Sequence, residues 1–517
     1  MSKTLTLSDV SQHNKPDDLW LVVNGAVYDM TDFAPVHPGG PDIIYRYAGR
    51  DASDESNAVH APSLIRKSLD EKHHIGDLDP AFVSEKEKEA DPQTTADASA
   101  NPSDAGHPNK ADLPATPSDT ALPIDASNYA DTKPPLGSLI NLYDFEHAAE
   151  KTLTKKAWAY ISSGSNDCIT RDANTAFLQR IWFRPAVMRN VATLNTKTRL
   201  FGCDLDFSIY VTPMGGVRSA GVEGELALAH GAAESGVIQC IATPSAYPHQ
   251  EVIDATPQHA FFQLYILKDR ARCEGLLRMV TQSDKIKAIF VTADSPVISK
   301  REDDERAKPE QFVQNSNKGQ PTLKKDWKGA GIARQAASFI DPSFNWDDLA
   351  WLRTITSLPI VVKGIQRWED AKLAMQYGCQ GIVLSNHGGR AADNAPPAIL
   401  LLLEMHMNFP EAFAFMDVLI DGGCRRGSDV VKAICLGASA VGLGRPLFYA
   451  VNYGTEGVKH AINIVQDEIE TAMRLCGIKD LMRDASPDFL NTADIDHLVI
   501  KGGHPYARKT IKIKSVL

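Results

Sequence analysis

Two motifs in the second half of the chain combine glycine with side chains that could do chemistry. SNHGGR at 385–390 places a histidine three residues before an arginine, and DGGCR at 421–425 places two glycines beside another arginine. Glycine lets backbone N–H groups approach an anion closely, and arginine binds a carboxylate or phosphate through two parallel hydrogen bonds. Histidine exchanges a proton near neutral pH. The pattern predicts acid–base chemistry on an anion, beside a phosphate site.

Other polar side chains follow short apolar runs in the same part of the chain. Any one of them has an ordinary structural explanation, as a turn or a hydrogen-bonded strand end. Their joint occurrence after successive runs favours one shared site. These residues are Gln263, Tyr265, Thr292, Asp294, Lys363, Gly444 and Arg445.

The elements that must position these residues are eight apolar runs separated by amphipathic segments. Buried strands that alternate with helices pair in parallel, and eight of them predict a closed (β/α)₈ TIM barrel of the α/β class. Such barrels carry catalytic groups at the carboxyl ends of the strands and a phosphate site after strands seven and eight. The runs are 207–212, 236–242, 260–266, 288–292, 359–363, 381–385, 418–421 and 440–444.

Composition divides the chain of 517 residues into four parts. Residues 1–80 predict a small α+β domain, in which Asn24-Gly25 marks a hairpin turn. Residues 81–135 hold eight prolines and predict a flexible acidic linker. Residues 136–480 form the predicted barrel, with a tail at 481–517. The charged insertion at about 300–340 predicts a lid or an exposed loop.

Charge is concentrated at the N-terminal end. Residues 1–80 carry 7 basic and 13 acidic side chains, and residues 81–135 carry 4 and 10. An acidic head on a nearly neutral body does not suit nucleic acid, which requires a basic surface, but it suits a basic protein partner. No apolar run is long enough to span a membrane. Eight cysteines without a paired spacing indicate free thiols, and with no targeting segment in the sequence we expect a cytoplasmic protein.

The body resembles the FMN-dependent 2-hydroxy acid dehydrogenase and oxidase family. The resemblance rests on YISSG at 160–164, QLY at 263–265, TAD at 292–294, SNHGGR at 385–390, DGGCRRG at 421–427 and GLGRP at 442–446. It implies FMN as cofactor and a small 2-hydroxy acid as substrate.

The resemblance also implies the role of each side chain. His387 is the base, either for the α-proton, leaving a carbanion, or for the hydroxyl proton while hydride passes to the flavin. Asp294 orients and stabilises the imidazole. Arg390 binds the carboxylate, assisted by Tyr160 and Arg301. The remaining implied contacts are Tyr265 to the substrate hydroxyl, Lys363 to flavin N1–O2, Gln263, Thr292 and Ser385 to the flavin ring, and Asp421, Gly422, Gly423, Arg425, Gly444 and Arg445 to the rest of FMN and its phosphate.

The head resembles cytochrome b5 through HPGG at 37–40 and a second histidine, His60, 23 positions after His37. Two imidazoles would fill both axial positions of haem iron and leave electron transfer as its chemistry. The order of head, linker and barrel is similar to the flavocytochrome b2 type. That similarity implies haem b at His37 and His60, electron transfer to a basic acceptor such as cytochrome c, and a homotetramer.

The chain departs from the family pattern beside the expected flavin site. Pro213-Met214-Gly215 stands where the family usually has Pro-Thr-Ala, and Ala242 stands where a serine or threonine is common. These changes alter the expected pocket wall and leave the substrate side chain open. Two other hypotheses remain at this point, namely an oxygen-using oxidase and a haem- and FMN-binding protein that has lost catalysis.

Overall fold

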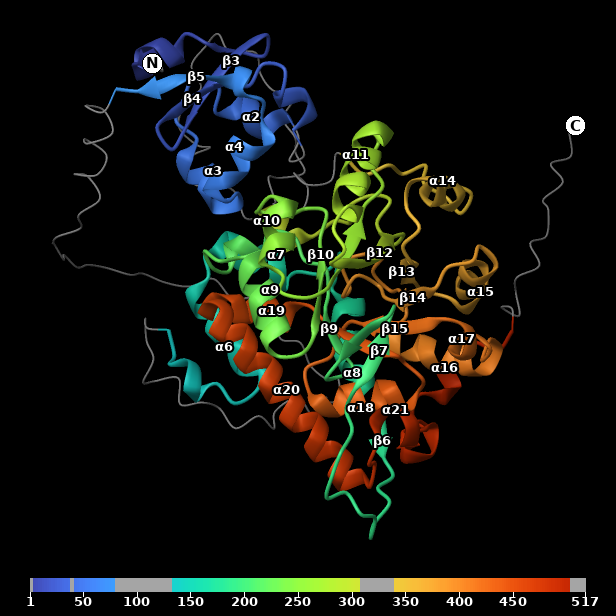
Figure 1. Cartoon of the computed structure of the whole chain (residues 1–517). Coiled ribbons are helices and arrows are strands. Elements are labelled where there is room, and N and C mark those ends of the chain that lie inside the picture. The colour runs from blue at the N-terminus through green and yellow to red at the C-terminus, as the bar shows by residue number, and fades with distance from the viewer. Residues whose placement is uncertain (1–2, 38–40, 80–132, 307–338, 503–517) are drawn as a thin grey trace, which may run out of the picture.

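The chain folds into a small N-terminal head and a larger barrel, drawn in blue and in green to red in Figure 1. The computed structural model describes residues 3–37, 41–79, 133–306 and 339–502. The expected linker at 81–135 therefore lies almost wholly outside the described residues, as does most of the insertion at 300–340.

The barrel is closed by eight parallel strands, as the sequence predicts. Each strand is a short run of β-branched and other apolar residues, because it is covered on both faces. The strands are β9 (Ile209–Val211), β10 (Ile238–Ile241), β11 (Ala260–Leu264), β12 (Ile286–Thr292), β13 (Ile360–Ile365), β14 (Gly381–Leu384), β15 (Asp417–Asp421) and β16 (Ala440–Leu443). β16 pairs with β9, which completes the ring.

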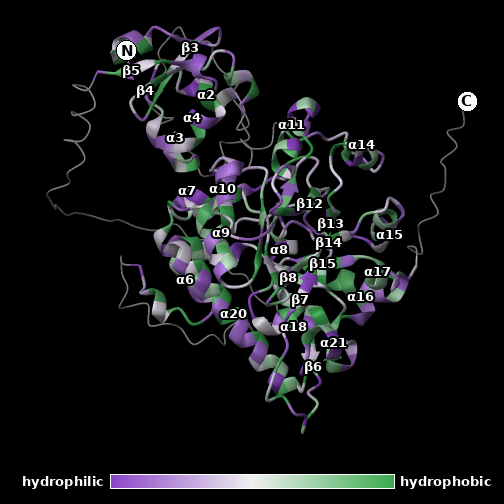
Figure 2. Ribbon diagram, in the orientation of Figure 1, coloured by the Kyte–Doolittle hydropathy of each residue, from purple (hydrophilic) through white to green (hydrophobic). Residues whose placement is uncertain are grey.

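Helices cover the outer face of this ring, and Figure 2 shows their hydrophilic surfaces directed outward. The helices between and after the strands are α9 (Glu225–Glu234), α10 (His249–Ala255), α11 (Arg270–Thr281), α12 (Glu302–Arg306), α14 (Asp348–Ile355), α15 (Trp368–Gln376), α16 (Ala398–Asn408), α17 (Ala412–Phe415), α18 (Gly427–Cys435), α19 (Arg445–Ala450), α20 (Gly454–Cys476) and α21 (Leu481–Asp484). Three more precede the barrel, α6 (Leu142–Thr152), α7 (Lys155–Ser162) and α8 (Ile169–Gln179). Within the described parts of the chain, none of these helices is both long and apolar enough to cross a bilayer.

A hairpin closes the amino-terminal mouth of the barrel. Its strands are β7 (Thr198–Leu200) and β8 (Cys203–Leu205), and Leu200 and Leu205 belong to the cluster that fills the barrel interior. Phe201 at the turn meets the edges of Phe261 and Phe290, at centroid distances of 5.5 and 5.9 Å. The interior is therefore solid at this end, and only the carboxyl ends of the strands remain for a ligand.

Residues 481–499, expected as the start of a tail, pack onto the barrel. Leu481, Phe489, Leu490 and Ile495 are buried within the same apolar cluster as the outer faces of the strands. Strand β17 (Leu490–Asn491) pairs with β6 (Trp182–Phe183). The barrel domain thus extends past residue 480, because these apolar side chains cover its surface.

The head is a five-stranded sheet with three short helices on one side. The strands are β1 (Lys3–Leu5), β2 (Asn14–Lys15), β3 (Asp18–Val23), β4 (Ala26–Asp29) and β5 (His74–Leu78), and the helices are α2 (Pro41–Arg46), α3 (Ser53–Val59) and α4 (Pro62–Ser68). A further helix, α1 (Leu7–Ser11), follows β1. Asn24 and Gly25 have φ of 52° and 79°, which forms the tight hairpin turn expected between β3 and β4.

Candidate active site

A cavity opens at the carboxyl ends of the barrel strands and is strongly cationic. Of the charged side chains that line it in the described part of the chain, only Asp421 is acidic. The basic ones are Arg301, Lys363, Arg390, Arg425 and Arg445. Such an excess of cations suits a ligand, or a pair of ligands, that carries several negative charges.

His387 and Asp294, which the sequence predicts to act together, lie within hydrogen-bond distance of each other. The His387 Nδ1 atom lies 2.8 Å from Asp294 Oδ1. Burial opposes ionisation of Asp294, but the adjacent His387 and Lys363 outweigh burial and hold the pKa of this carboxyl well below its usual range. An ionised carboxylate only accepts hydrogen bonds, so Nδ1 carries the proton and the other ring nitrogen keeps a free lone pair.

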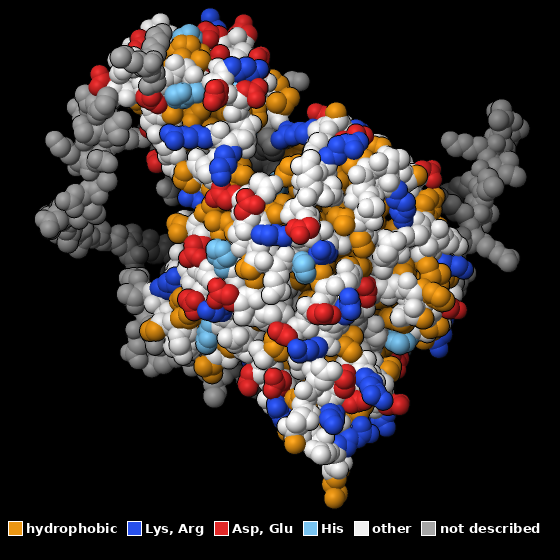
Figure 3. Space-filling model, viewed as in Figure 1, with side chains coloured by type: hydrophobic (Ala, Val, Ile, Leu, Met, Phe, Trp, Pro, Cys, Tyr) orange, Lys and Arg blue, Asp and Glu red, His pale blue; other side chains and the backbone are white. Residues whose placement is uncertain are grey.

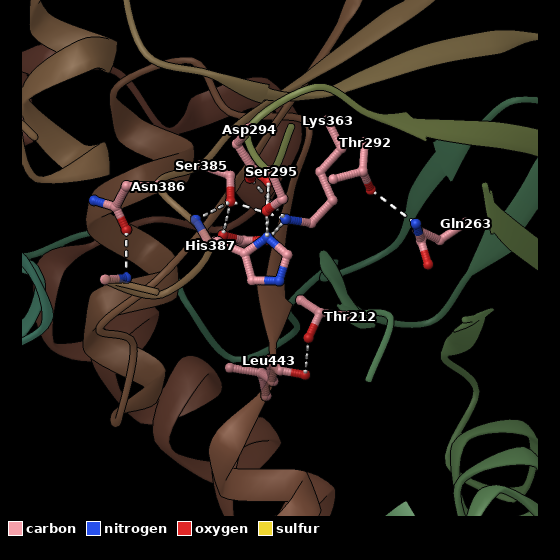
Figure 4. Close-up of polar contacts among 12 residues, drawn as sticks. Thr212, Gln263, Thr292, Asp294, Ser295, Lys363, Ser385, Asn386, His387 and Leu443 are labelled. Carbon is pink, nitrogen blue, oxygen red and sulfur yellow. Dashed lines mark hydrogen bonds and ion pairs between the residues drawn. The ribbon is translucent and has the colours of Figure 1, made fainter. Parts of the chain in front are cut away.

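The free nitrogen of His387 points away from Asp294 (Figure 4). Burial lowers the pKa of His387 more than the attraction of Asp294 raises it, so the ring is neutral at pH 7. The residue also has a φ of 60°, in the left-handed region that non-glycine residues rarely adopt. A neutral imidazole held in a strained backbone position is poised to accept a proton.

Ser295 is a third member of this group that sequence reasoning missed. Its hydroxyl donates to Asp294 Oδ1 at 2.8 Å and lies 3.2 Å from His387 Nδ1. The only available signal was its position directly after Asp294, which is no more than a strand-end serine. The hydroxyl fixes the carboxylate that in turn fixes the imidazole.

Lys363 is the centre of a buried polar network (Figure 4). Its ammonium lies 3.6 Å from Asp294 Oδ2 and 3.4 Å from Asp421 Oδ2, and it donates to Ser385 Oγ at 3.0 Å. Ser385 donates in turn to Asp421 Oδ1 at 2.6 Å. Burial alone would lower the pKa of Lys363, but Asp421 and Asp294 raise it above its ordinary value. The cavity floor therefore holds a permanent positive charge.

Arg301 and Arg390 bring unused donors to the cavity. The Nε atoms of both are buried and have no hydrogen-bond partner among the described residues. Burial and the neighbouring charge of Arg390 lower the pKa of Arg301 to about 9. Two guanidinium groups whose buried Nε donors are unused favour an anion, and a planar carboxylate matches their geometry. This arrangement agrees with the carboxylate role predicted for both residues.

Tyr160 and Tyr265, both expected to contact the substrate, line the same cavity. The Tyr160 hydroxyl donates to the Gly215 carbonyl at 3.1 Å, and its ring lies 4.7 Å from the Arg390 guanidinium. Burial and the nearby Asp294 raise the pKa of Tyr265 to about 12, so its hydroxyl stays protonated and can donate.

Gln263 and Thr292 form one polar edge of the cavity, as expected for residues beside a flavin ring. Gln263 Oε1 accepts from the Thr243 N–H at 3.1 Å. Gln263 Nε2 donates to Thr292 Oγ1 at 2.9 Å (Figure 4). Both residues are buried. Their amide and hydroxyl groups offer donors and acceptors to a planar heterocycle.

The loops after β15 and β16 supply the predicted phosphate side. Gly423 has a φ of 82°, and a Cβ there would lie 2.3 Å from the backbone carbon of Asn174, so the loop contacts α8 closely. Gly422, Gly423, Arg425, Gly444 and Arg445 all line the cavity. Arg445 donates to the carbonyls of Ile161, Gly388 and Ser163 at 2.8 to 2.9 Å, which joins three loops and keeps its charge at the cavity.

The two head histidines face one another. The ring centroids of His37 and His60 are 6.1 Å apart, close to the roughly 6 Å expected when two imidazole nitrogens share one metal at about 2 Å each. Burial, His37 and Arg218 lower the pKa of His60 to about 4, which keeps it neutral as ligation requires. The ring of Phe33 lies edge-on to His37, with the centroids 5.6 Å apart. The pair therefore fits a haem with two axial imidazoles.

The sequence departures lie on the cavity wall. Met214, Gly215, Ala242 and Pro244 all line it. So does Phe339, at the end of the insertion, which sequence reasoning could not place because no periodic pattern connects it to a strand. This part of the wall is thus built from apolar groups that the family motifs do not specify.

Comparison with known proteins agrees with this geometry. Residues 149–492 match the family model described as FMN-dependent dehydrogenase, and residues 6–79 match the cytochrome b5-like haem/steroid binding domain. The chain is similar to L-lactate dehydrogenase (cytochrome) of Wickerhamomyces anomalus, with 38% identity over 97% of this chain and 82% of the relative. It is 37% identical to glycolate oxidase 3 of Oryza sativa subsp. indica over 66% of this chain and 94% of that oxidase.

Among solved structures, the recombinant flavin-binding domain of baker's yeast flavocytochrome b2 is similar in both fold and sequence. The TM-score is 0.63 and the identity 38%, over 72% of this chain and 91% of that domain. The similarity to L-lactate dehydrogenase (cytochrome) extends over a larger share of this chain, 97%, than the similarity to the oxidase, 66%.

Proposed function

Since the chain belongs to the FMN-dependent dehydrogenase family and carries a cytochrome b5-like head, we propose that it oxidises a small L-2-hydroxy acid to the 2-oxo acid. Electrons pass from FMN to haem b and then to a cytochrome c-like acceptor. The observation that carries the proposal is the neutral His387, held by Asp294 in a cavity lined by two arginines whose buried Nε atoms have no partner within the described residues.

Different side chains of the cavity bind different groups of the substrate. Arg390 and Arg301 bind its carboxylate, which supplies the missing partner of their buried Nε atoms. Tyr265, with its hydroxyl protonated, contacts the substrate hydroxyl. These contacts fix the α-carbon against the free nitrogen of His387, and orientation of this kind lowers the entropic part of the barrier.

His387 accepts a proton in either route that the family chemistry allows, from the α-carbon or from the hydroxyl. Asp294 stabilises the imidazolium so formed, because the carboxylate is already ionised and hydrogen-bonded to Nδ1. Bound FMN would supply two-electron acceptance and bound haem one-electron transfer, which no side chain offers. The Lys363 ammonium contributes positive charge at the floor of the same cavity.

An acceptor of the cytochrome c kind suits the head. Its residues carry 13 acidic and 7 basic side chains, a surface that attracts a basic protein. The oxidase alternative assigns the head no part in turnover. The haem-ligand geometry of His37 and His60 and the contacts of the head with the barrel favour the dehydrogenase.

The test is a visible spectrum of the full-length holoprotein mixed without oxygen with a panel of L-2-hydroxy acids that starts from lactate. We expect flavin bleaching followed by the bands of reduced haem. Flavin bleaching without haem reduction, together with rapid oxygen consumption in air, would support the oxidase. No bleaching with any member of the panel would contradict the enzyme assignment altogether.

Two finer features belong to the same proposal. We propose a homotetramer, an assembly that the resemblance to the flavocytochrome b2 type supports and that light scattering of the purified holoprotein would test. We also propose a cytoplasmic location, supported by eight cysteines that are all free thiols, seven of them buried. Fractionation of cells that express the chain would test the location.

A further inference from the structure

The head is seated on the barrel by specific polar contacts. α3 and α4 lie toward the barrel, above α10 and α7 (Figure 1). Lys67 and Ser63 both contact Glu251 Oε2, at 2.9 and 3.0 Å, and Arg272 Nη1 donates to the Val36 carbonyl at 3.1 Å. On the face drawn in Figure 3, charged side chains of both signs lie along this boundary.

One peptide of the head is held by the barrel at both of its ends. It joins His60, the predicted haem ligand, to Ala61. The His60 carbonyl accepts a hydrogen bond from Arg218 Nη1 at 2.9 Å, and the Ala61 N–H donates to the Ala246 carbonyl at 2.8 Å. Arg218 Nη1 also donates to the Asn57 carbonyl at the end of α3.

The two barrel groups come from loops that line the active-site cavity. Arg218 follows Gly215 after β9, and Ala246 follows Pro244 after β10. These loops touch one another, since a Cβ on Gly215 would lie 3.0 Å from Pro244 Cγ. Arg218, which contacts His60, therefore lies only three residues after Gly215 of the cavity wall.

Arg218 lies within electrostatic range of a buried carboxyl group, that of Glu225. Its Nε is buried and has no hydrogen-bond partner within the described residues. The buried Glu225 accepts the Ala246 N–H at 3.0 Å and lies in the field of the Arg218 charge. Glu225 thus contacts the loop that carries Ala246 and attracts the Arg218 charge on the other loop.

We propose that Arg218 is a positioning residue for electron transfer between the domains, which holds the His60–Ala61 peptide on the loops of the flavin cavity. The inference rests on the proposed function. In the step concerned, one electron leaves reduced FMN and converts ferric haem to ferrous haem, and no bond forms or breaks. Because the rate of electron transfer falls as the distance between the two groups grows, a head held at a fixed position beside the cavity should transfer electrons faster than a head that is not held there.

The test compares Arg218→Gln with Arg218→Lys and with a control, Arg278→Gln, in the full-length holoprotein. Arg278 lies on α11, is mostly exposed and pairs only weakly with Glu274, at 3.6 Å. Two measurements are made without oxygen. The first is hydrogen exchange at the Ala61 amide. The second is the rate at which haem is reduced after a light pulse has reduced the flavin with electrons from an added sacrificial donor, a reaction that requires no substrate.

Arg218→Gln should raise exchange at Ala61 and slow haem reduction by about 10- to 100-fold, the factor that loss of a charged hydrogen bond implies. The low-spin haem spectrum should be unchanged, and flavin reduction by substrate should stay within about twofold. Arg218→Lys keeps the charge but cannot reach both the Asn57 and the His60 carbonyls. Its rates of amide exchange and haem reduction should therefore lie between those of Arg218→Gln and the unchanged protein. Arg278→Gln should match the unchanged protein.

Exchange and haem reduction in Arg218→Gln that equal those of Arg278→Gln would overturn the proposal. An Arg218→Gln protein that loses its haem spectrum would also overturn it, because the residue would then support the fold of the head. If the unchanged protein reduces haem after the light pulse but oxidises no 2-hydroxy acid, the substrate assignment fails while the role of Arg218 is still decided by these two measurements.

Discussion

His387 can act as a base because its surroundings settle which of its two nitrogens is protonated. Ser295 and Lys363 each contact Asp294, whose ionised carboxylate keeps the proton on His387 Nδ1. The sequence identifies the histidine and the aspartate by motif. Ser295 has no such signal, because its role appears only when residues 92 positions apart are brought together.

The first residue-scale prediction concerns the base. His387→Gln should retain FMN but lose about 10²- to 10⁴-fold in the rate of flavin reduction by substrate, the usual contribution of a general base. Asp294→Asn should change the rate in the same direction, because an amide no longer enforces the tautomer. Rapid-mixing absorbance at the flavin band measures both. Ser295→Ala is the matched control and should cost less than Asp294→Asn, and near-normal reduction by His387→Gln would contradict the assignment.

The second concerns the buried Glu225. Burial raises its pKa to about 7, in spite of the Ala246 N–H and Arg218, which favour ionisation. The unfolded chain releases this proton near pH 4.5 and the folded chain near 7, so folding stability from this group is present below 4.5 and is lost as pH rises to about 7, by about 3 kcal/mol. Glu225→Gln should therefore gain thermal stability relative to the unchanged protein at pH 8 but little at pH 4.5. Parallel melting curves across this range would refute the raised pKa.

At the scale of elements, the barrel follows from the sequence more completely than the site does. The run predicted at 260–266 contains β11, and the run at 381–385 contains β14. The prediction works because a strand that is buried on both faces has a continuous run of apolar residues. Contacts between loops leave no such pattern. Arg218 and His60 are 158 positions apart and belong to different domains, so their pairing follows only from docked surfaces.

The loop after β15 carries an element-scale prediction. Gly423→Ala places a Cβ 2.3 Å from the Asn174 backbone at a φ of 82°, so the loop must move away from α8. We expect weaker FMN retention and a cost of a few kcal/mol, of the order seen for strained left-handed positions. Flavin fluorescence released on dilution measures the first, and a melting curve measures the second. Gly275→Ala, where a Cβ meets nothing within 4 Å, is the control.

At the scale of the whole molecule, the acidic head and the nearly neutral body should respond differently to a basic protein acceptor and to a small uncharged acceptor. Residues 1–80 carry 13 acidic and 7 basic side chains. Attraction between this surface and a basic protein is screened over about 8 Å at physiological ionic strength. The contact between the head and the barrel also contains ion pairs, such as Lys67 with Glu251, but these are partly exposed and individually weak.

Reduction of cytochrome c should therefore slow as salt rises, because long-range steering toward the head is lost. A small uncharged acceptor that takes electrons directly from the flavin should show little change over the same range. Steady-state rates with both acceptors, from low salt to about 0.5 M, make the comparison. Equal salt dependence for the two would show that the acidic head does not recruit the protein acceptor.

The hairpin of β7 and β8 leaves the barrel with one open end. Within the described residues this leaves one way out of the cavity, so in the proposed function the 2-oxo acid departs past the same arginines that receive the 2-hydroxy acid. Both acids carry the carboxylate that Arg301 and Arg390 bind. Occupancy by one excludes the other, and accumulated 2-oxo acid should raise the apparent KM for the hydroxy acid while the maximal rate stays the same, so that turnover slows as its own product builds up.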